Sequence, residues 1–170
     1  MTTVSVNNPS GSGEPDSQKL LAIGIIGLGG VAQAHLQAFA SLDNLNIVSV
    51  CDVRADVAQT IADRYDANPY SDYHELLNAG GLDLVLVLTP AATHRDIIMA
   101  VANAGVHVFC EKPLAITLAD GEAMVSACNS AGVKLFYGAS YRYLPAIVKA
   151  KQLIDAGTLG EVQLMTEQVV

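Results

Sequence analysis

The feature that most constrains the fold is a glycine-rich turn at residues 27–32, with the sequence Gly-Leu-Gly-Gly-Val-Ala. An apolar run precedes this turn, and a helix-like stretch follows it. A second apolar run, residues 47–51, ends directly before Asp52. Strand, turn, helix, strand and acid in this order are typical of a fold that binds dinucleotides. The first glycine permits the turn, the second lets the backbone approach a pyrophosphate, and the alanine allows close packing of the helix. These residues are Gly27, Gly29 and Ala32.

The acid and its neighbour bear on which dinucleotide would bind. Asp52 can accept hydrogen bonds from both hydroxyls of an adenosine ribose, while the pyrophosphate would lie at the positive end of the following helix. Asp52 favours NAD over NADP, because a 2′-phosphate would meet its negative charge. Arg54 weakens that preference, since an arginine can pair with the phosphate or stack on adenine. The alternative is a structural glycine turn with Asp52 as a solvated loop acid. The flanking strand, helix and spacing favour dinucleotide binding.

Composition narrows the class of protein. The chain has 170 residues, of which 51% are hydrophobic, and its formal net charge is −8. This acidic balance argues against nucleic acid and anionic membranes as partners, although local backbone donors can still bind an anionic cofactor. No apolar run reaches membrane-spanning length. The first residues include no basic stretch followed by an apolar one, so we expect no export signal. The three cysteines show no metal-ligand spacing. We therefore predict a cytoplasmic protein with buried, reduced thiols and no metal site.

The distribution of polar and apolar stretches along the chain predicts its organisation. Residues 1–19 are rich in Asn, Pro, Ser, Gly and Asp and are expected to form a disordered tail. From residue 20 on, strand-like and helix-like segments alternate, and the strand-like runs are continuously apolar, as in a parallel sheet covered on both faces. This predicts a doubly wound α/β domain of the Rossmann type over residues 20–143. Strands are predicted at 21–28, 45–53, 82–89, 106–110 and 133–138, and helices at 31–42, 55–65, 73–78, 94–104, 118–131 and 145–156.

Two further motifs follow predicted strands, where ligands of open α/β sheets lie. In the first, Thr89 and Pro90 come at a strand end, and Thr93 is placed to cap the next helix. His94 would either contact a ligand there or face water at the helix start.

The second motif is the sequence Glu-Lys-Pro at residues 111–113. Adjacent charges at the tip of a buried strand are unusual. The alternative is a surface ion pair of little energetic value. Together with the glycine turn, the motif favours a functional site in which Lys112 orients a substrate hydroxyl. Glu111 would bind a second ribose or fix Lys112.

These motifs together resemble the Gfo/Idh/MocA oxidoreductase family. The resemblance rests on residues 27–32, on the segments 89–94 and 111–114, and on the segments 141–145 and 153–162. It implies NAD(P)-dependent oxidation or reduction of a sugar, a polyol or a related carbonyl compound. It also implies that Lys112 is the catalytic-site lysine. The cofactor-binding residues implied are Gly27, Gly29, Gly30, Val31, Ala32, Asp52, Arg54, Thr89, Pro90, His94, Glu111, Lys112 and Arg142.

The resemblance also sets expectations for what lies beyond the cofactor domain. Members are usually about twice as long, and a second, mostly antiparallel domain supplies their substrate pocket. We therefore expect residues 144–170 to form a linking helix and the first strand, 160–170, of a truncated α+β substrate domain. A full-length form could be a homo-oligomer. Two other readings stay open: a non-catalytic nucleotide-binding module or regulator, and a hydrolase or epimerase that uses bound NAD transiently.

Overall fold

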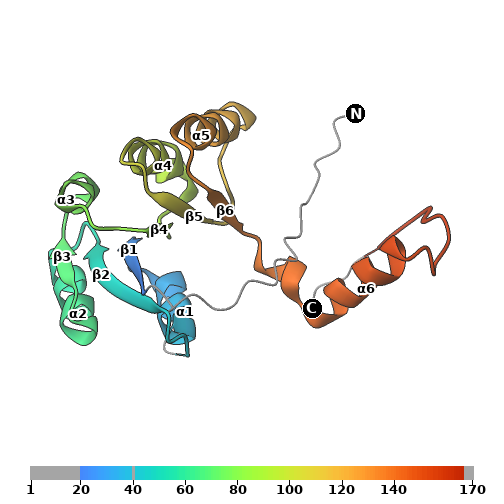
Figure 1. The fold of residues 1–170 in the computed structure, drawn as a ribbon, viewed down its shortest axis with the longest axis horizontal. Coiled ribbons are helices and arrows are strands. Elements are labelled where there is room, and N and C mark those ends of the chain that lie inside the picture. The colour runs from blue at the N-terminus through green and yellow to red at the C-terminus, as the bar shows by residue number, and fades with distance from the viewer. Residues whose placement is uncertain (1–19, 40, 167–170) are drawn as a thin grey trace. The chain divides into compact units, whose positions relative to one another are not determined.

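The computed structural model describes residues 20–39 and 41–166. The predicted disordered tail, residues 1–19, lies outside this range. The chain divides into two compact units, the first ending at Leu88 and the second beginning at Thr89. Each unit consists of parallel strands joined by helices, which makes the fold the predicted parallel, doubly wound α/β fold of the Rossmann type (Figure 1).

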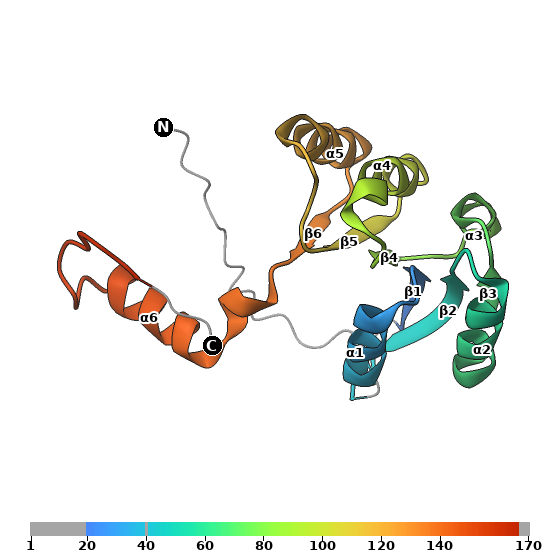
Figure 2. The same ribbon diagram turned by 180° about the vertical axis from the view of Figure 1, so that it is seen from behind.

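The first unit has four parallel strands in the order β3-β2-β1-β4. Helices α1 and α2 lie on one side of these strands and α3 lies on the other, as both views show (Figures 1 and 2). The elements are β1 (Leu21–Ile26), α1 (Gly30–Phe39), β2 (Leu45–Cys51), α2 (Ala55–Tyr65), β3 (Asn68–Tyr70), α3 (Tyr73–Ala79) and β4 (Leu84–Val87).

The second unit pairs two parallel strands, β5 and β6, with helices α4 and α5 on one side of them (Figure 1). An ion pair between Arg95 and Asp120, with an N–O distance of 3.3 Å, links the starts of these two helices. The elements are η1 (Ala91–Thr93), α4 (His94–Asn103), β5 (His107–Glu111), α5 (Leu118–Ala131), β6 (Leu135–Gly138), η2 (Ser140–Tyr143) and α6 (Pro145–Asp155).

Continuous apolar runs build the core because both faces of the strands are covered. In β1, Ile23 and Ile25 are fully buried, and so are Val85 and Val87 in β4. Short polar side chains cap the starts of two helices. Asp72 accepts a hydrogen bond from the backbone of His74 at the start of α3, and Thr117 accepts one from Asp120 at the start of α5. Both caps satisfy backbone donors that a helix start leaves unpaired.

Two strand predictions differ from the structure. The sequence does not predict β3, because the strand has three residues and Pro69 at its centre disfavours strand structure. Residues 160–166 form no strand, contrary to the prediction for 160–170, and residues 167–170 lie outside the described range. A strand needs hydrogen bonds from a neighbour, and the described residues pair none with this segment. The assignment of residues 144–170 to a second domain stays a prediction.

Candidate dinucleotide-binding site

The glycine turn connects β1 to α1 in the first unit. The Gly27 N–H donates to the Cys51 carbonyl at 2.8 Å, which fastens the turn to the end of β2. Gly27 has a φ of 91°, a backbone conformation that residues other than glycine rarely adopt. Helix α1 begins at Gly30, and its small residue Ala32 is fully buried. The local roles predicted for Gly27 and Ala32, turning and close packing, therefore have a structural basis.

The surface of the turn leaves room for a ligand. Gly29 and Gly30 are exposed, and an added Cβ at either position would meet no heavy atom within 4 Å. The first N–H groups of a helix have no partner one turn earlier within it. The Ala32 N–H donates to the Gly29 carbonyl at 3.1 Å, which leaves the N–H groups of Gly30 and Val31 as candidate donors to a ligand. A pyrophosphate fits such a place, because its charge complements both the donors and the positive end of the helix.

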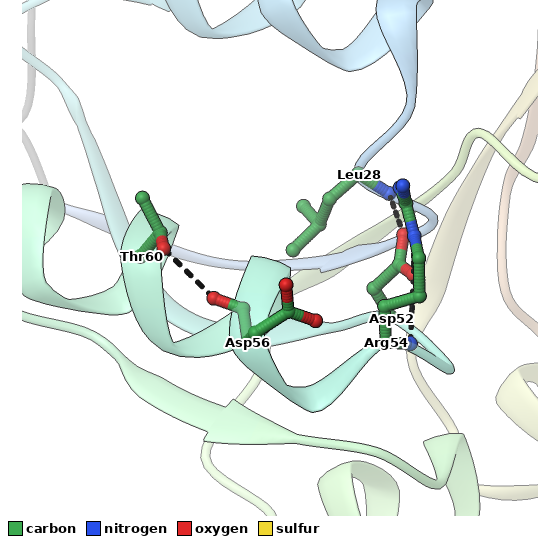
Figure 3. A network of polar contacts seen from close by, with 5 residues as sticks. All are labelled: Leu28, Asp52, Arg54, Asp56 and Thr60. Atoms are coloured by element: carbon green, nitrogen blue, oxygen red, sulfur yellow. Dashed lines mark hydrogen bonds and ion pairs between the residues drawn. The ribbon is translucent and has the colours of Figure 1, made fainter.

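Asp52, directly after β2, is bonded to the glycine turn (Figure 3). Its Oδ2 accepts a hydrogen bond from the Leu28 N–H at 2.9 Å. Its Oδ1 accepts from the Arg54 backbone N–H at 3.0 Å and from the Arg54 Nε at 3.3 Å. Burial opposes ionisation of Asp52, but the hydrogen bonds from Arg54 and Leu28 outweigh it and hold the pKa of the carboxyl below its ordinary value.

The free lone pairs of Asp52 determine what else it can bind. A carboxylate has about four acceptor positions, two on each oxygen. Arg54 occupies both positions of Oδ1, whereas Leu28 leaves one position free on Oδ2. The Arg54 side chain is 60% exposed, while the Asp52 side chain is 10% exposed. One ribose hydroxyl can therefore bind directly, and a second can bind when the Arg54 guanidinium moves aside.

The second unit carries the other predicted site residues. Thr89 and Pro90 follow β4, and the Thr93 hydroxyl bonds to the Thr89 hydroxyl and to the Pro90 carbonyl, both at 2.8 Å. The predicted side-chain cap of α4 by Thr93 is wrong, because its hydroxyl is used within this turn instead.

His94 begins α4, and its ring is fully buried. The reading in which it faces water is therefore wrong. Both ring nitrogens lie against other groups of the second unit. Nε2 is 2.8 Å from the Thr89 carbonyl oxygen, and Nδ1 is 3.1 Å from that of Leu114. The Cys110 sulfur lies 3.2 Å from Nδ1.

Glu111 and Lys112 lie where the sequence places them, at the carboxyl end of β5. Glu111 is the last residue of the strand and half-buried, and Lys112 and Pro113 are exposed. The Lys112 N–H donates to the Glu111 carboxylate, and the peptide bond from Lys112 to Pro113 is cis. An exposed ammonium at a strand tip is accessible to a substrate hydroxyl.

Arg142 lies in η2 and is exposed. Its backbone N–H donates to the Ala139 carbonyl at 3.3 Å, and its guanidinium lies 6.0 Å from the centre of the Tyr143 ring. These contacts are local, so they define a place for Arg142 on its own segment.

Sequence reasoning missed three participants. The Leu28 N–H, the Leu114 carbonyl and the Cys110 thiol all contact predicted site residues. Two of these are backbone groups, which every residue type carries, so no residue identity signals them. Cys110 precedes Glu111 in a buried strand, and a buried thiol ordinarily packs as a small apolar group.

The fold, the glycine turn and the bonded acid define a Rossmann domain suited to a dinucleotide. Residues 21–139 match the family model described as "Oxidoreductase family, NAD-binding Rossmann fold", GFO_IDH_MocA. The chain belongs to the Gfo/Idh/MocA oxidoreductase family and carries its NAD-binding domain.

Curated relatives include inositol dehydrogenases. Inositol 2-dehydrogenase from Salmonella paratyphi B is 36% identical over 145 residues, which are 83% of this chain and 43% of the relative. Myo-inositol 2-dehydrogenase from Thermotoga maritima is 34% identical over 142 residues, which are 83% of this chain and 42% of the relative. The chain thus spans less than half the length of these relatives.

A solved dehydrogenase structure is similar in fold to this chain. The WlbA dehydrogenase from Bordetella pertussis, in complex with NADH and UDP-GlcNAcA, superposes with a TM-score of 0.82 at 32% identity. The match covers 86% of this chain and 43% of that chain. No helix in the described part of the chain has the length and apolarity needed to cross a membrane.

Proposed function

We propose that this protein is an NAD-dependent dehydrogenase of a sugar, polyol or related hydroxy compound, and that the present chain carries its cofactor-binding half. One observation carries the proposal: the carboxylate of Asp52 is bonded to the glycine turn by the Leu28 N–H at 2.9 Å. By the count of lone pairs, one acceptor position of Oδ2 then remains for a ribose hydroxyl. This arrangement brings a ribose acceptor and a phosphate cradle together within the first unit.

The residues of the first unit fit the adenosine half of the cofactor. The backbone of Gly29 and Gly30, with the start of α1, would hold the pyrophosphate together with Gly27, Val31 and Ala32. Asp52 would hold the ribose, and Arg54 would stack on adenine. When bound, the nicotinamide ring supplies the hydride chemistry, and the protein supplies binding and orientation.

The second unit would serve the nicotinamide half and the substrate. Thr89, Pro90 and Arg142 would flank the nicotinamide. Glu111 would hold its ribose, and Lys112 would orient the substrate hydroxyl and hold its proton at Nζ. The exposure of Lys112 and the bond between its N–H and the Glu111 carboxylate support these roles.

The relatives' names support a sugar or polyol as substrate, and a homo-oligomer is proposed for a full-length form. We also propose a cytoplasmic location. The three cysteines are unpaired and buried, as expected of a protein kept in a reducing compartment.

Calorimetric titration with NADH and NADPH tests the cofactor site. We expect micromolar binding of NADH and weaker binding of NADPH. Asp52→Ala should weaken NADH binding at least about tenfold, because a charge-assisted hydrogen bond is lost. The same change should reduce the preference of the protein for NADH over NADPH. Asp56→Ala is the matched control, since this exposed acid of α2 makes no side-chain contact in the network. Absence of binding by a folded protein would contradict the proposal.

A further inference from the structure

The strongest unexplained feature of the second unit is the imidazole of His94. It is the first residue of α4, yet its ring is fully buried. A buried polar ring destabilises the fold unless its nitrogens are hydrogen-bonded, and an apolar residue of similar size would avoid that penalty. The contacts of the ring should therefore explain why a histidine lies here.

The ring contacts two segments that are far apart in sequence. One is the Thr89 carbonyl, 2.8 Å from Nε2. The other begins at Cys110, whose sulfur is 3.2 Å from Nδ1, and ends at Leu114, whose carbonyl is 3.1 Å from Nδ1. Glu111 and Lys112 lie between these two contacts.

The protons on the ring nitrogens determine how the ring joins the two segments. A carbonyl only accepts, so the 2.8 Å contact with Thr89 requires a proton on Nε2. In the neutral ring, Nδ1 then accepts from the Cys110 thiol, which stays protonated because burial and the charge of Glu111 raise its pKa to about 12. In the imidazolium, Nδ1 donates to the Leu114 carbonyl. Both states connect Thr89 to the segment 110–114.

We propose that His94 is a positioning residue rather than a cofactor contact. Its buried ring fastens the turn after β4 to the segment 110–114, and so holds Glu111 and Lys112 in place. The link to the nicotinamide half rests on the proposed function, which assigns Glu111, Lys112 and Thr89 to that half.

The test compares two ligands in matched variants. NADH carries the nicotinamide and its ribose, whereas ADP keeps the adenosine and both phosphates and lacks the other two groups. The ratio of the two dissociation constants therefore reports on the nicotinamide and its ribose. His94→Ala removes the connection, and His94→Gln keeps a donor toward Thr89. Val101→Ala is the control, because Val101 is equally buried in α4 and its side chain makes no hydrogen bond. Hydrogen exchange of the amides of residues 111, 112, 114 and 115 reports on the segment without any ligand, since Pro113 has no N–H.

We expect His94→Ala to weaken NADH binding about tenfold and to leave ADP binding unchanged, because the loss corresponds to roughly one hydrogen bond that positions the segment. The amides of residues 111, 112, 114 and 115 should exchange faster than in Val101→Ala. His94→Gln should lie between His94→Ala and the unchanged protein, and it carries the comparison if His94→Ala does not fold.

Two results would overturn the role of His94. One is an unchanged ratio of NADH to ADP binding in the His94 variants, and the other is exchange of these amides no faster than in Val101→Ala. Failure of the unchanged protein to bind either ligand contradicts the proposed function instead. Equal affinity for the two ligands contradicts only the nicotinamide assignment. In both cases, the exchange comparison still decides whether His94 holds the segment.

Discussion

The carboxylate of Asp52 holds the glycine turn and also offers an acceptor to a ligand. The hydrogen bond from the Leu28 N–H to Oδ2 ties the end of β2 to the turn before any ribose is bound. The side chain is thus held in place in advance, which reduces the entropy lost when a ligand is ordered against it. A single residue therefore couples the stability of the turn to the proposed binding site.

This coupling predicts a pH dependence. Hydrogen bonds lower the pKa of Asp52 in the folded protein, so its ionised form stabilises the fold. That contribution is fully present above the unfolded pKa of about 3.9 and is lost as the pH falls through the lower folded value. Urea unfolding of the protein and of Asp52→Asn should therefore show a stability difference at pH 7 that shrinks as the pH falls below about 4. A difference that is constant over this range would contradict the assignment.

At the scale of elements, the approach of β5 to β6 depends on Gly138. A Cβ at this position would lie 2.9 Å from the Phe109 Cζ and 3.1 Å from the Cys110 carbonyl oxygen. One of these neighbours is an aromatic ring and the other is backbone, so neither moves easily. The last residue of β6 must therefore be small for the two strands to pair.

Gly138→Ala should lower the free energy of unfolding by about 1–3 kcal/mol, because of this overpacking. Gly121→Ala is the control, since Gly121 lies within α5 and its nearest neighbour would be 3.9 Å away. Alanine in a helix should raise stability there by up to about 1 kcal/mol. Chemical denaturation of both variants measures the difference in their free energies of unfolding. Equal effects of the two substitutions would contradict the packing argument.

The end of α2 offers a second element-scale prediction. Asp66 has a φ of 52° and closes the helix in the left-handed conformation, with its N–H donating to the Ala62 carbonyl. Because a side chain is strained there, Asp66→Gly should stabilise the protein by about 0.5–1 kcal/mol. Asp63→Gly, inside the same helix, should instead destabilise it by about 1 kcal/mol. Thermal unfolding of the two variants distinguishes them by sign.

The whole molecule carries thiols in both units, and all three are buried. Burial, followed by the nearby carboxylates of Asp72, Asp52 and Glu75, raises the pKa of Cys51 to about 11. Burial also raises the pKa of Cys128. We predict that iodoacetamide at about pH 8.5, near the ordinary pKa of cysteine, modifies none of the three in the native protein and all three in concentrated urea. Mass spectrometry counts the adducts, and rapid native modification of any one would contradict its burial.

The sequence allows the architecture to be predicted better than the site. Apolar runs such as β1 and β4 identify buried parallel strands because burial on both faces requires them. The short strand β3 cannot be predicted in this way, since its pairing with β2 comes from tertiary contact and not from its own residues. The burial and the partners of His94 cannot be predicted either. Its partners are the Thr89 and Leu114 carbonyls, and every residue type carries a backbone carbonyl.

Pro69 has a consequence for the outer side of β3. The Tyr70 carbonyl accepts from the Asp52 N–H, so Tyr70 presents its backbone toward β2. Neighbouring residues of a strand present their backbone groups to opposite sides, so Pro69 presents its own outward, where a proline has no N–H to donate. Another chain that approached this edge would find a missing donor at the centre of a three-residue strand. The first unit thus has an edge that resists strand-to-strand aggregation.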